Sequence, residues 1–262
     1  MGCAFVFDVK SRTSLIAYEG FQGTADVDLD GNGSGTGWAD ASWTDENGTA
    51  SQFVYEDPGL VHKTLAVSGL SATYKGNGSG ANTRYSRGLD TTITLDTDGE
   101  TLWASYILDM QETFSGRGFG VELTNNGSPV VAFGKGVNSS SGLGTAFTSN
   151  WENVGNPTGV KLLMLELFYD LTADETTAML LIDGSASAPL GSASATGSIT
   201  IPGPVTIDGV NLYGYHTDTV DNTLDELRLG DTQGDVIPVP EPMSLALLGL
   251  GASVILLQRR RR

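Results

Sequence analysis

Short β-type segments separated by glycine-rich turns are the feature that most constrains the fold of this chain. The 262 residues include 35 glycines, and Ser, Thr, Asn and Asp are frequent between the apolar runs. These residues favour turns because Gly accepts positive φ and short polar side chains bond to their own backbone. Residues 15–232 contain no run with clear helix start and stop signals. The pattern therefore predicts an all-β body, a two-sheet antiparallel jelly-roll sandwich.

The predicted strands follow one another along this body. We expect them at residues 15–21, 52–55, 63–67, 91–95, 101–110, 118–124, 129–135, 160–171, 177–182, 205–215 and 224–229. The Asn-Asn-Gly sequence at 125–127 predicts a hairpin turn, because both residue types accept positive φ. The apolar segment 160–171 is long enough for a helix, but no cap precedes it and 177–182 suits a partner strand, so we expect a hairpin. Residues 26–43 and 185–197 are expected to be loops.

The carboxyl end of the chain has a different chemistry. A proline-containing segment comes first, made of Val239, Pro240, Glu241 and Pro242. An uncharged apolar run follows, containing Met243, Leu245, Leu247, Leu248, Leu250, Val254, Ile255, Leu256 and Leu257. Four arginines then end the chain, at Arg259, Arg260, Arg261 and Arg262. The order of these parts predicts a single C-terminal hydrophobic helix that enters a membrane.

The length and charge of this segment indicate how it would lie in a membrane. As a helix, the 15 residues of 243–257 reach roughly 22 Å, which is short of a hydrocarbon core about 30 Å thick. Long arginine side chains extend that reach by snorkelling to the headgroups. Arginines on one side predict a cytoplasmic carboxyl terminus and a body on the outer face. A buried helix with a basic tail is the alternative, although such a helix is normally amphipathic.

The Val-Pro-Glu-Pro sequence, the apolar run with Leu-Leu-Gly-Leu-Gly at 247–251 and the terminal arginines together resemble the PEP-CTERM sorting domain. This domain is also known as an ice-binding-protein C-terminal domain. The resemblance covers residues 239–262 and implies recognition by an exosortase, a membrane protease-transpeptidase. It implies a transient membrane-inserted precursor, cleavage near 240–242, and release or attachment at the cell surface or extracellular matrix.

The amino-terminal residues 1–14 fit a remnant or a truncated signal region. Residues 1–7 are apolar, but Asp8 and Lys10 interrupt them, so the run is too short for a signal peptide. A start site placed downstream of the true signal is one explanation, and a vestigial tail on a protein that stays inside is the other. The predicted organisation continues with the body at 15–232, a linker at 233–242 and the sorting and membrane segment at 239–262.

The charge of the chain narrows its partners. The formal net charge is −17, and setting aside the four terminal arginines leaves −21 for the rest. Such a surface repels nucleic acid and anionic lipid. The single cysteine rules out an intramolecular disulfide and a cluster of thiolate ligands for zinc. We therefore expect no nucleic-acid partner.

The body has a resemblance of its own. It rests on Ala-Tyr-Glu-Gly-Phe at 17–21, Gly-Thr-Gly-Trp at 35–38, Thr-Leu-Trp-Ala-Ser at 101–105 and Leu-Asp-Glu-Leu-Arg-Leu-Gly at 224–230. In this order the motifs resemble the LamG-like, concanavalin-A-like jelly rolls of secreted bacterial proteins. The resemblance implies carbohydrate or matrix contact, as an analogy of fold and not of a site.

Four aromatic residues are candidates for contact with a polysaccharide: Trp38, Trp43, Tyr213 and Tyr215. Exposed aromatic rings can stack on the faces of sugar rings. The alternative for Trp38 and Trp43 is that they plug the edge of the sandwich.

Three carboxylates suggest calcium as a candidate ion. Asp26, Asp28 and Asp30 precede Gly31, as in the first half of a calcium loop. Gly37 stands where the loop would need its bidentate Glu, so the full motif is absent. An acidic surface loop and a calcium ion with other ligands are both compatible with this pattern.

No catalytic residue is predicted. Asp225 and Glu226 are adjacent in an expected strand, so their side chains should point to opposite faces. The chain lacks a Gly-x-Ser-x-Gly motif and has two histidines. We therefore expect a non-catalytic matrix or polysaccharide-binding module. A glycan-active enzyme on the same jelly roll and a purely structural surface filler are the alternatives. Two carboxylates on one face, about 5 to 9.5 Å apart, would favour the enzyme.

Overall fold

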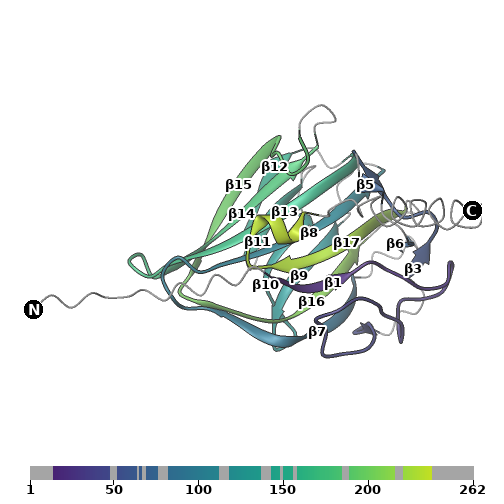
Figure 1. Cartoon of the computed structure of the whole chain (residues 1–262), viewed down its shortest axis with the longest axis horizontal. Helices are drawn as coiled ribbons and strands as arrows, with labels where there is room; N and C mark the ends of the chain where they lie inside the picture. The colour runs from purple at the N-terminus through teal and green to yellow at the C-terminus, as the bar shows by residue number, and fades with distance from the viewer. Residues whose placement is uncertain are drawn as a thin grey trace, which may run out of the picture.

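Two antiparallel sheets packed face to face form the body of the molecule (Figure 1). The computed structural model describes residues 14–47, 52–63, 65–66, 69–75, 82–111, 118–136, 143–147, 150–155, 158–184, 189–215 and 221–237. The predicted all-β two-sheet sandwich is confirmed. The predicted C-terminal hydrophobic helix falls within residues 238–262, outside this range. Within the range, no helix has the length and apolar character needed to cross a bilayer.

The larger sheet has eight strands in the order β15-β14-β13-β8-β17-β6-β3, with β1 also paired to β17. Their bounds are β1 Leu15–Glu19, β3 Phe53–Glu56, β6 Ser71–Tyr74, β8 Thr101–Met110, β13 Gly159–Asp170, β14 Glu175–Asp183, β15 Ala195–Pro202 and β17 Asn222–Gly230. The second sheet has seven strands in the order β12-β11-β10-β9-β16-β7-β2. Their bounds are β2 Thr44–Asp45, β7 Asn82–Leu95, β9 Gly118–Asn125, β10 Ser128–Lys135, β11 Leu143–Phe147, β12 Asn150–Gly155 and β16 Val205–Tyr215.

The main core lies between the two sheets and follows the alternation of side chains along each strand. On β9 the inward residues include Val121 and Leu123, and on β13 they include Leu163 and Leu165. Aromatic rings fill one part of this layer, with Phe53 at 5.2 Å from both Tyr74 and Tyr85, centroid to centroid. Burial of apolar area at this layer is the main source of stability.

Both hairpins expected from the sequence are present. The β9–β10 turn places Asn126 at φ +50° and Gly127 at φ +72°, as the Asn-Asn-Gly sequence predicted. Strand β13 pairs with β14 along its length, so the prediction of a strand at 160–171 is confirmed. Strand β13 has buried apolar side chains on both faces. One face lies in the main core, and the other face is covered by further segments of the chain.

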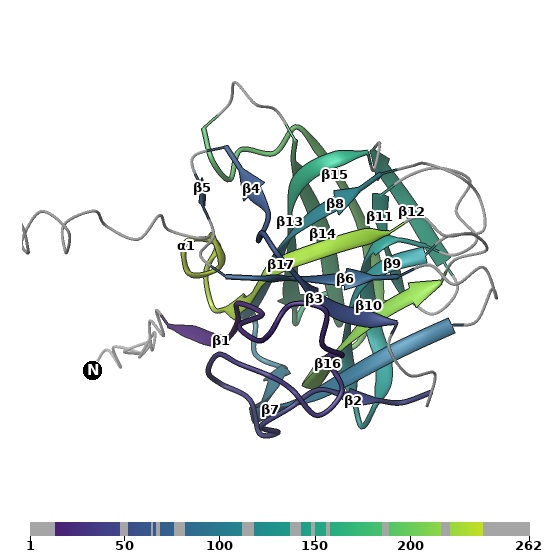
Figure 2. The ribbon, with the colours of Figure 1, turned by 90° about the vertical axis from the view of Figure 1, so that its right-hand side faces the viewer.

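The second face of β13 lies under a group of segments that we call the cap. The cap consists of the β4–β5 hairpin (β4 Val61–His62, β5 Leu65–Ala66), residues 189–191 and the helix α1 (Gln233–Val236) with Ile237. Figure 2 shows β4, β5 and α1 together on one side of the sandwich. A second apolar cluster lies between the cap and the outer face of the eight-stranded sheet: Leu65, Trp103, Ile107, Leu162, Met164 and Val236.

Three predicted segments differ from the structure. Residues 63–67 were expected as one strand, but the chain turns at Lys63, where φ is +54°, and forms a hairpin. The expected loop 185–197 ends early, because β15 begins at Ala195 and pairs with Ile182. The linker expected from residue 233 begins as α1, whose Val236 is fully buried against the sheet. Strands β2, β6, β11, β12 and β15 were not predicted, nor was the first part of β7, residues 82–90.

Candidate functional site

The outer face of the seven-stranded sheet carries a set of polar residues that we call the polar row: Arg84, Ser86, Glu122, Asn211 and Tyr213. They come from the adjacent strands β7, β16 and β9, where Asn211 is in register with both Glu122 and Ser86, and Tyr213 with Arg84. Along each strand they alternate with core residues, so they face away from the core.

Hydrogen bonds join the members of the polar row. Arg84 donates from Nε to Glu122 Oε2 at 2.8 Å and from Nη2 to Glu122 Oε1 at 2.9 Å. Asn211 Nδ2 donates to the same Oε2 at 3.1 Å. Because β16 lies between β7 and β9, the ion pair spans the middle strand. The Arg84 side chain is 40% exposed and that of Glu122 is 7% exposed. The bidentate contact raises the pKa of Arg84 and holds its guanidinium in one orientation at the surface.

The two tyrosines predicted as sugar contacts differ in exposure. Tyr213 is 8% exposed, and its hydroxyl donates to the Lys135 carbonyl oxygen at 3.0 Å. Burial also raises the pKa of Tyr213 well above its usual value. The ring is therefore too covered to serve as an open platform, and this prediction is wrong for Tyr213. Tyr215 is half-buried at the end of β16 and stays a candidate.

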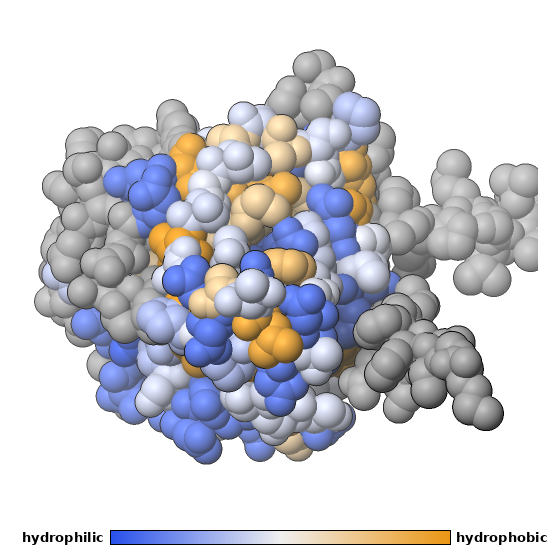
Figure 3. Space-filling model, turned by 90° about the vertical axis from the view of Figure 1, so that its left-hand side faces the viewer, coloured by the Kyte–Doolittle hydropathy of each residue, from blue (hydrophilic) through white to orange (hydrophobic). Residues whose placement is uncertain are grey.

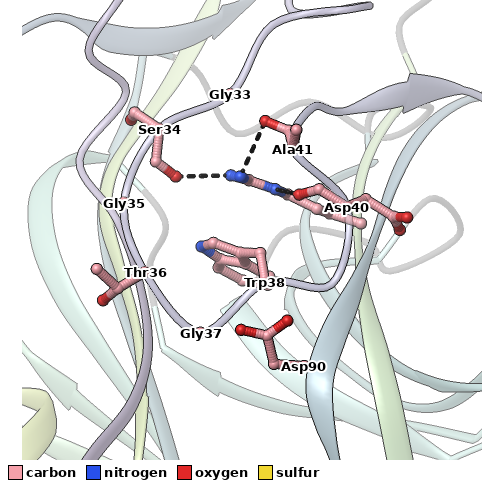
Figure 4. Close-up of a pocket in the computed structure, with 10 residues that line it drawn as sticks. Gly33, Ser34, Gly35, Thr36, Gly37, Trp38, Asp40, Ala41 and Asp90 are labelled. Carbon is pink, nitrogen blue, oxygen red and sulfur yellow. Dashed lines mark hydrogen bonds between the residues drawn. The ribbon is translucent and has the colours of Figure 1, made fainter.

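A hollow of about 450 Å³ lies beside the loop between β1 and β2 (Figure 4). Its lining includes Trp38, Asp40, Arg87 and Asp90 and the loop residues 33–37. The Arg87 guanidinium lies 5.0 Å from the centre of the Trp38 ring.

The donors of Arg87 are already engaged by the protein. Arg87 forms a buried ion pair with Glu19. It donates to three loop carbonyl oxygens, of Ser34 at 2.8 Å, Asp40 at 3.0 Å and Ala41 at 3.2 Å. Arg87 therefore fixes the loop against the sheet, and the hollow contains no free guanidinium to bind an anion.

The loop's tryptophans are structural. Trp43 is fully buried, and its Nε1 donates to Glu19 Oε2 at 3.3 Å, so the prediction of a sugar contact at Trp43 is wrong. Trp38 is 8% exposed, and its Nε1 donates to the Tyr18 carbonyl oxygen at 2.8 Å. Gly35, at φ +82°, has no room for a Cβ, which would lie 1.7 Å from that same oxygen. The alternative, that these tryptophans plug the sandwich, matches their burial.

The acidic loop residues do not form a cation site among the described residues. Asp28 Oδ1 accepts from the Asp30 backbone N at 2.9 Å and from the Tyr85 hydroxyl at 2.8 Å. Asp30 Oδ1 accepts from the Asp45 backbone N at 3.0 Å. The described part of the chain contains no group of three or more His, Cys, Asp or Glu side chains placed to hold a metal ion. The calcium prediction for Asp26, Asp28 and Asp30 therefore gains no geometric support.

Asp225 and Glu226 do not follow the simple alternation of side chains that was expected for strand β17. The pairing with β8 shifts register between Asp225 and Arg228, and Glu226 has φ +54°, so simple alternation fails here. Both side chains are buried. Asp225 Oδ2 accepts from the Leu60 backbone N at 2.9 Å, and burial raises the pKa of Asp225 to about 8. Glu226 accepts from Tyr18 and from Arg228, at 2.9 and 2.7 Å. These contacts make the pair structural.

The comparison with family models matches residues 238–262 to the PEP-CTERM protein-sorting motif. The chain therefore carries this motif, which indicates export and membrane-associated sorting to the cell surface. The motif covers the tail alone and says nothing about the sandwich. No curated protein matches the chain.

Several solved structures resemble the body at low sequence identity. Domain 4 of an extracellular arabinanase from Geobacillus stearothermophilus is 14% identical, with a TM-score of 0.47, covering 86% of this chain and 97% of that one. A polysaccharide lyase family 7 alginate lyase is 8% identical, with a TM-score of 0.42 and coverage of 82% and 93%. A Lotus tetragonolobus seed lectin is 11% identical, with a TM-score of 0.37 and coverage of 72% and 98%.

Sequence analysis did not select Arg84, Glu122 or Asn211. A signal for Glu122 was available, because it stands between Val121 and Leu123 in a strand whose alternation places it on the outer face. Its partner Arg84 could not be inferred, since nothing in the sequence indicates that β7 and β9 lie on either side of β16.

Proposed function

We propose that this protein is an exported, non-catalytic polysaccharide-binding module that contacts the glycan through Arg84, the exposed cation of the polar row. The observation that carries the proposal is the surface ion pair between Arg84 and Glu122, which Asn211 completes on the middle strand. Arg84 presents the exposed guanidinium of the row, whereas Glu122 and Asn211 are buried and hold it in one orientation. A guanidinium fixed in this way suits the hydroxyl groups of a sugar, because it loses little conformational entropy on binding. The sorting motif supports an extracellular setting in which such polymers occur.

The charge of the body selects among polysaccharides. Residues other than the terminal arginines carry −21, so a polyuronate would be repelled over most of the surface. A neutral polymer avoids this repulsion and can still form hydrogen bonds with the polar row. We therefore expect neutral polysaccharides as ligands, with Tyr215 at the end of the row as the aromatic contact.

Affinity electrophoresis of the full chain with soluble xylan and glucan as neutral probes and alginate as the polyanionic probe tests this proposal. We expect a neutral polysaccharide to retard the migration of the protein, and we expect Arg84→Gln to abolish this retardation. Lys75→Gln is the matched control, because Lys75 forms ion pairs with Glu56 and Asp221 at 3.0 and 3.1 Å, away from the polar row. Equal retardation of both variants would refute the assignment to the polar row. Release of new reducing ends or unsaturated products would favour the glycan-active enzyme instead.

A further inference from the structure

The described chain ends at Ile237, inside the cap, and its position there is fixed by packing and hydrogen bonds. Val236 is fully buried, and its carbonyl oxygen accepts a hydrogen bond from Ser105 Oγ. A Cβ added to Gly191 would lie 2.5 Å from Ile237 Cδ1, so Ile237 packs directly on that glycine. The sorting segment therefore leaves the body from a defined point on the cap.

The β4–β5 hairpin presents an exposed apolar side chain in the same cap. Val61 is 59% exposed, the largest exposure among the large hydrophobic residues described as exposed. Leu60, Leu190 and Ile237 are half-buried and pack against the same apolar cluster beneath.

Two buried aspartate side chains hold these parts of the cap to the sheet. Asp183 forms an ion pair with Lys63 of the hairpin and accepts from the Gly191 backbone N at 2.7 Å. Asp225 accepts from the Leu60 backbone N at 2.9 Å. The hairpin that carries Val61 and the segment at residues 189–191 are therefore attached to the sheet at several points.

The length of the tether restricts where the cap can lie. Five residues, 238–242, separate Ile237 from Met243, the first residue of the apolar run. Even fully extended, the six steps between these two residues span roughly 20 Å. The 12 residues of β13 span about 40 Å. A bilayer that holds the apolar run therefore keeps the cap nearby, while the far end of β13 can lie well away from it.

We infer that, in the membrane-inserted precursor, the cap rests on the bilayer surface and Val61 contacts the lipid. This inference rests on the sorting half of the proposed function and does not require the polysaccharide half. The occupant of the apolar surface is the lipid, because the tether brings the bilayer within reach and Val61 offers exposed apolar area beside the exit point. The polar row lies on the outer face of the other sheet, so this contact leaves it free.

Polarity-sensitive fluorophores on single cysteines provide the test. The full chain, with its one native cysteine changed by Cys3→Ser, is placed in vesicles of zwitterionic phosphatidylcholine, which avoids repulsion of the acidic body. Val61→Cys carries the probe at the cap. Leu171→Cys is the matched control, because Leu171 is 57% exposed and follows the carboxyl end of β13. The hairpin that carries Val61 is held near the amino end of β13, where Lys63 pairs with Asp183, the partner of Leu162. Quenching by lipids with a nitroxide in the headgroup region is then measured.

The expected result is quenching several-fold stronger at residue 61 than at residue 171, together with a blue-shifted emission at residue 61. Weak quenching at both positions in a protein that floats with the vesicles would overturn this inference and leave the sorting segment intact. Equal strong quenching at both positions would also overturn it, since the contact would not be specific to the cap. A protein that fails to float with the vesicles would overturn the membrane role of the tail, and the inference with it.

A second pair of variants measures the same contact without a probe. Val61→Asp should lower the fraction of full-length protein that floats with the vesicles in the presence of urea too dilute to unfold it, because a charged side chain is disfavoured at the interface. Leu171→Asp should leave that fraction unchanged. Equal flotation of the two variants would contradict the lipid contact at Val61.

Discussion

The outer faces of the two sheets have opposite chemistry. The face of the seven-stranded sheet is polar, and the ion pair of Arg84 and Glu122 spans β16 on it. The face of the eight-stranded sheet is apolar around Leu162 and Met164, and the cap covers it. A strand that is apolar on both faces needs a third layer, whereas a strand with polar residues on one face can leave that face to solvent or to a ligand.

The side of the molecule shown in Figure 3 is neither fully polar nor fully apolar. Hydrophilic residues predominate there, and apolar residues form small groups between them. Scattered apolar residues of this kind are normal on a soluble surface.

The largest effect is expected from a substitution beneath the cap, on the covered face of the eight-stranded sheet. Val236→Asp places a carboxylate with no partner under the cap, and we expect it to lower the free energy of unfolding by about 4–5 kcal/mol. Val27→Asp, at a valine that is 40% exposed, should change it by less than about 0.5 kcal/mol. Urea unfolding followed by tryptophan fluorescence measures both. Similar losses would mean that the cap is not a packed layer.

A pH series tests Asp225, which joins the cap to β17. Its pKa is raised to about 8 by burial, from 3.8. The folded state therefore binds this proton more tightly, so the contribution of Asp225 to stability is fully present below about pH 4 and is lost as the pH rises through about 8, by on the order of a few kcal/mol. Asp225→Asn should remove this slope, whatever constant offset it adds. Denaturant unfolding from pH 5 to pH 9 provides the measurement, with Asp98→Asn as the exposed control. A slope equal to that of the parent would refute the assignment.

Substitutions in the polar row should lower the free energy of unfolding less than substitutions under the cap. Arg84→Met leaves the Glu122 carboxylate with Asn211 alone, and we expect a loss of about 1–2 kcal/mol. Lys75→Met removes half-exposed ion pairs and should cost about 0.5 kcal/mol or less. Thermal unfolding of the two variants at low and high salt separates these values. If Lys75→Met is the more damaging change, the polar row contributes less to stability than an ordinary surface pair.

The smallest expected effect concerns calcium. Asp28 and Asp30 accept hydrogen bonds from the chain itself. The protein should therefore keep its stability without a divalent ion. We expect the same melting temperature in excess calcium and in excess chelator. A midpoint that rises with calcium would revive the ion-binding prediction for this loop.

The sequence predicted the fold well in segments whose local pattern is typical of a single structure. The Asn-Asn-Gly turn at 125–127 and the apolar strand at 160–171 were both predicted. The short strands β11 and β12 were missed because their small and polar residues have no clear apolar alternation. The Asp225–Glu226 bulge was missed because a bulge depends on the partner strand and leaves no mark in the strand's own pattern.

The candidate site was predicted less well than the fold. Aromatic residues were selected as ligand contacts, but Trp43 and Tyr213 are covered by packing. The polar row depends on residues from three strands that are distant in sequence, so their meeting is a property of the topology. The tail differs from both, because its signal is contiguous and needs no tertiary contact to be recognised.

The two ends of the described body emerge as neighbours, because Leu15 on β1 is paired with Gly230 at the end of β17. Such proximity makes circular permutation feasible. A gene that joins residues 237 and 14 through a short peptide, with new ends opened at the 125–127 turn, should encode the same sandwich. Placing the sorting tail at the new end would then turn the body over relative to the membrane, and would show whether its orientation at the cell surface matters for the proposed binding of a polysaccharide.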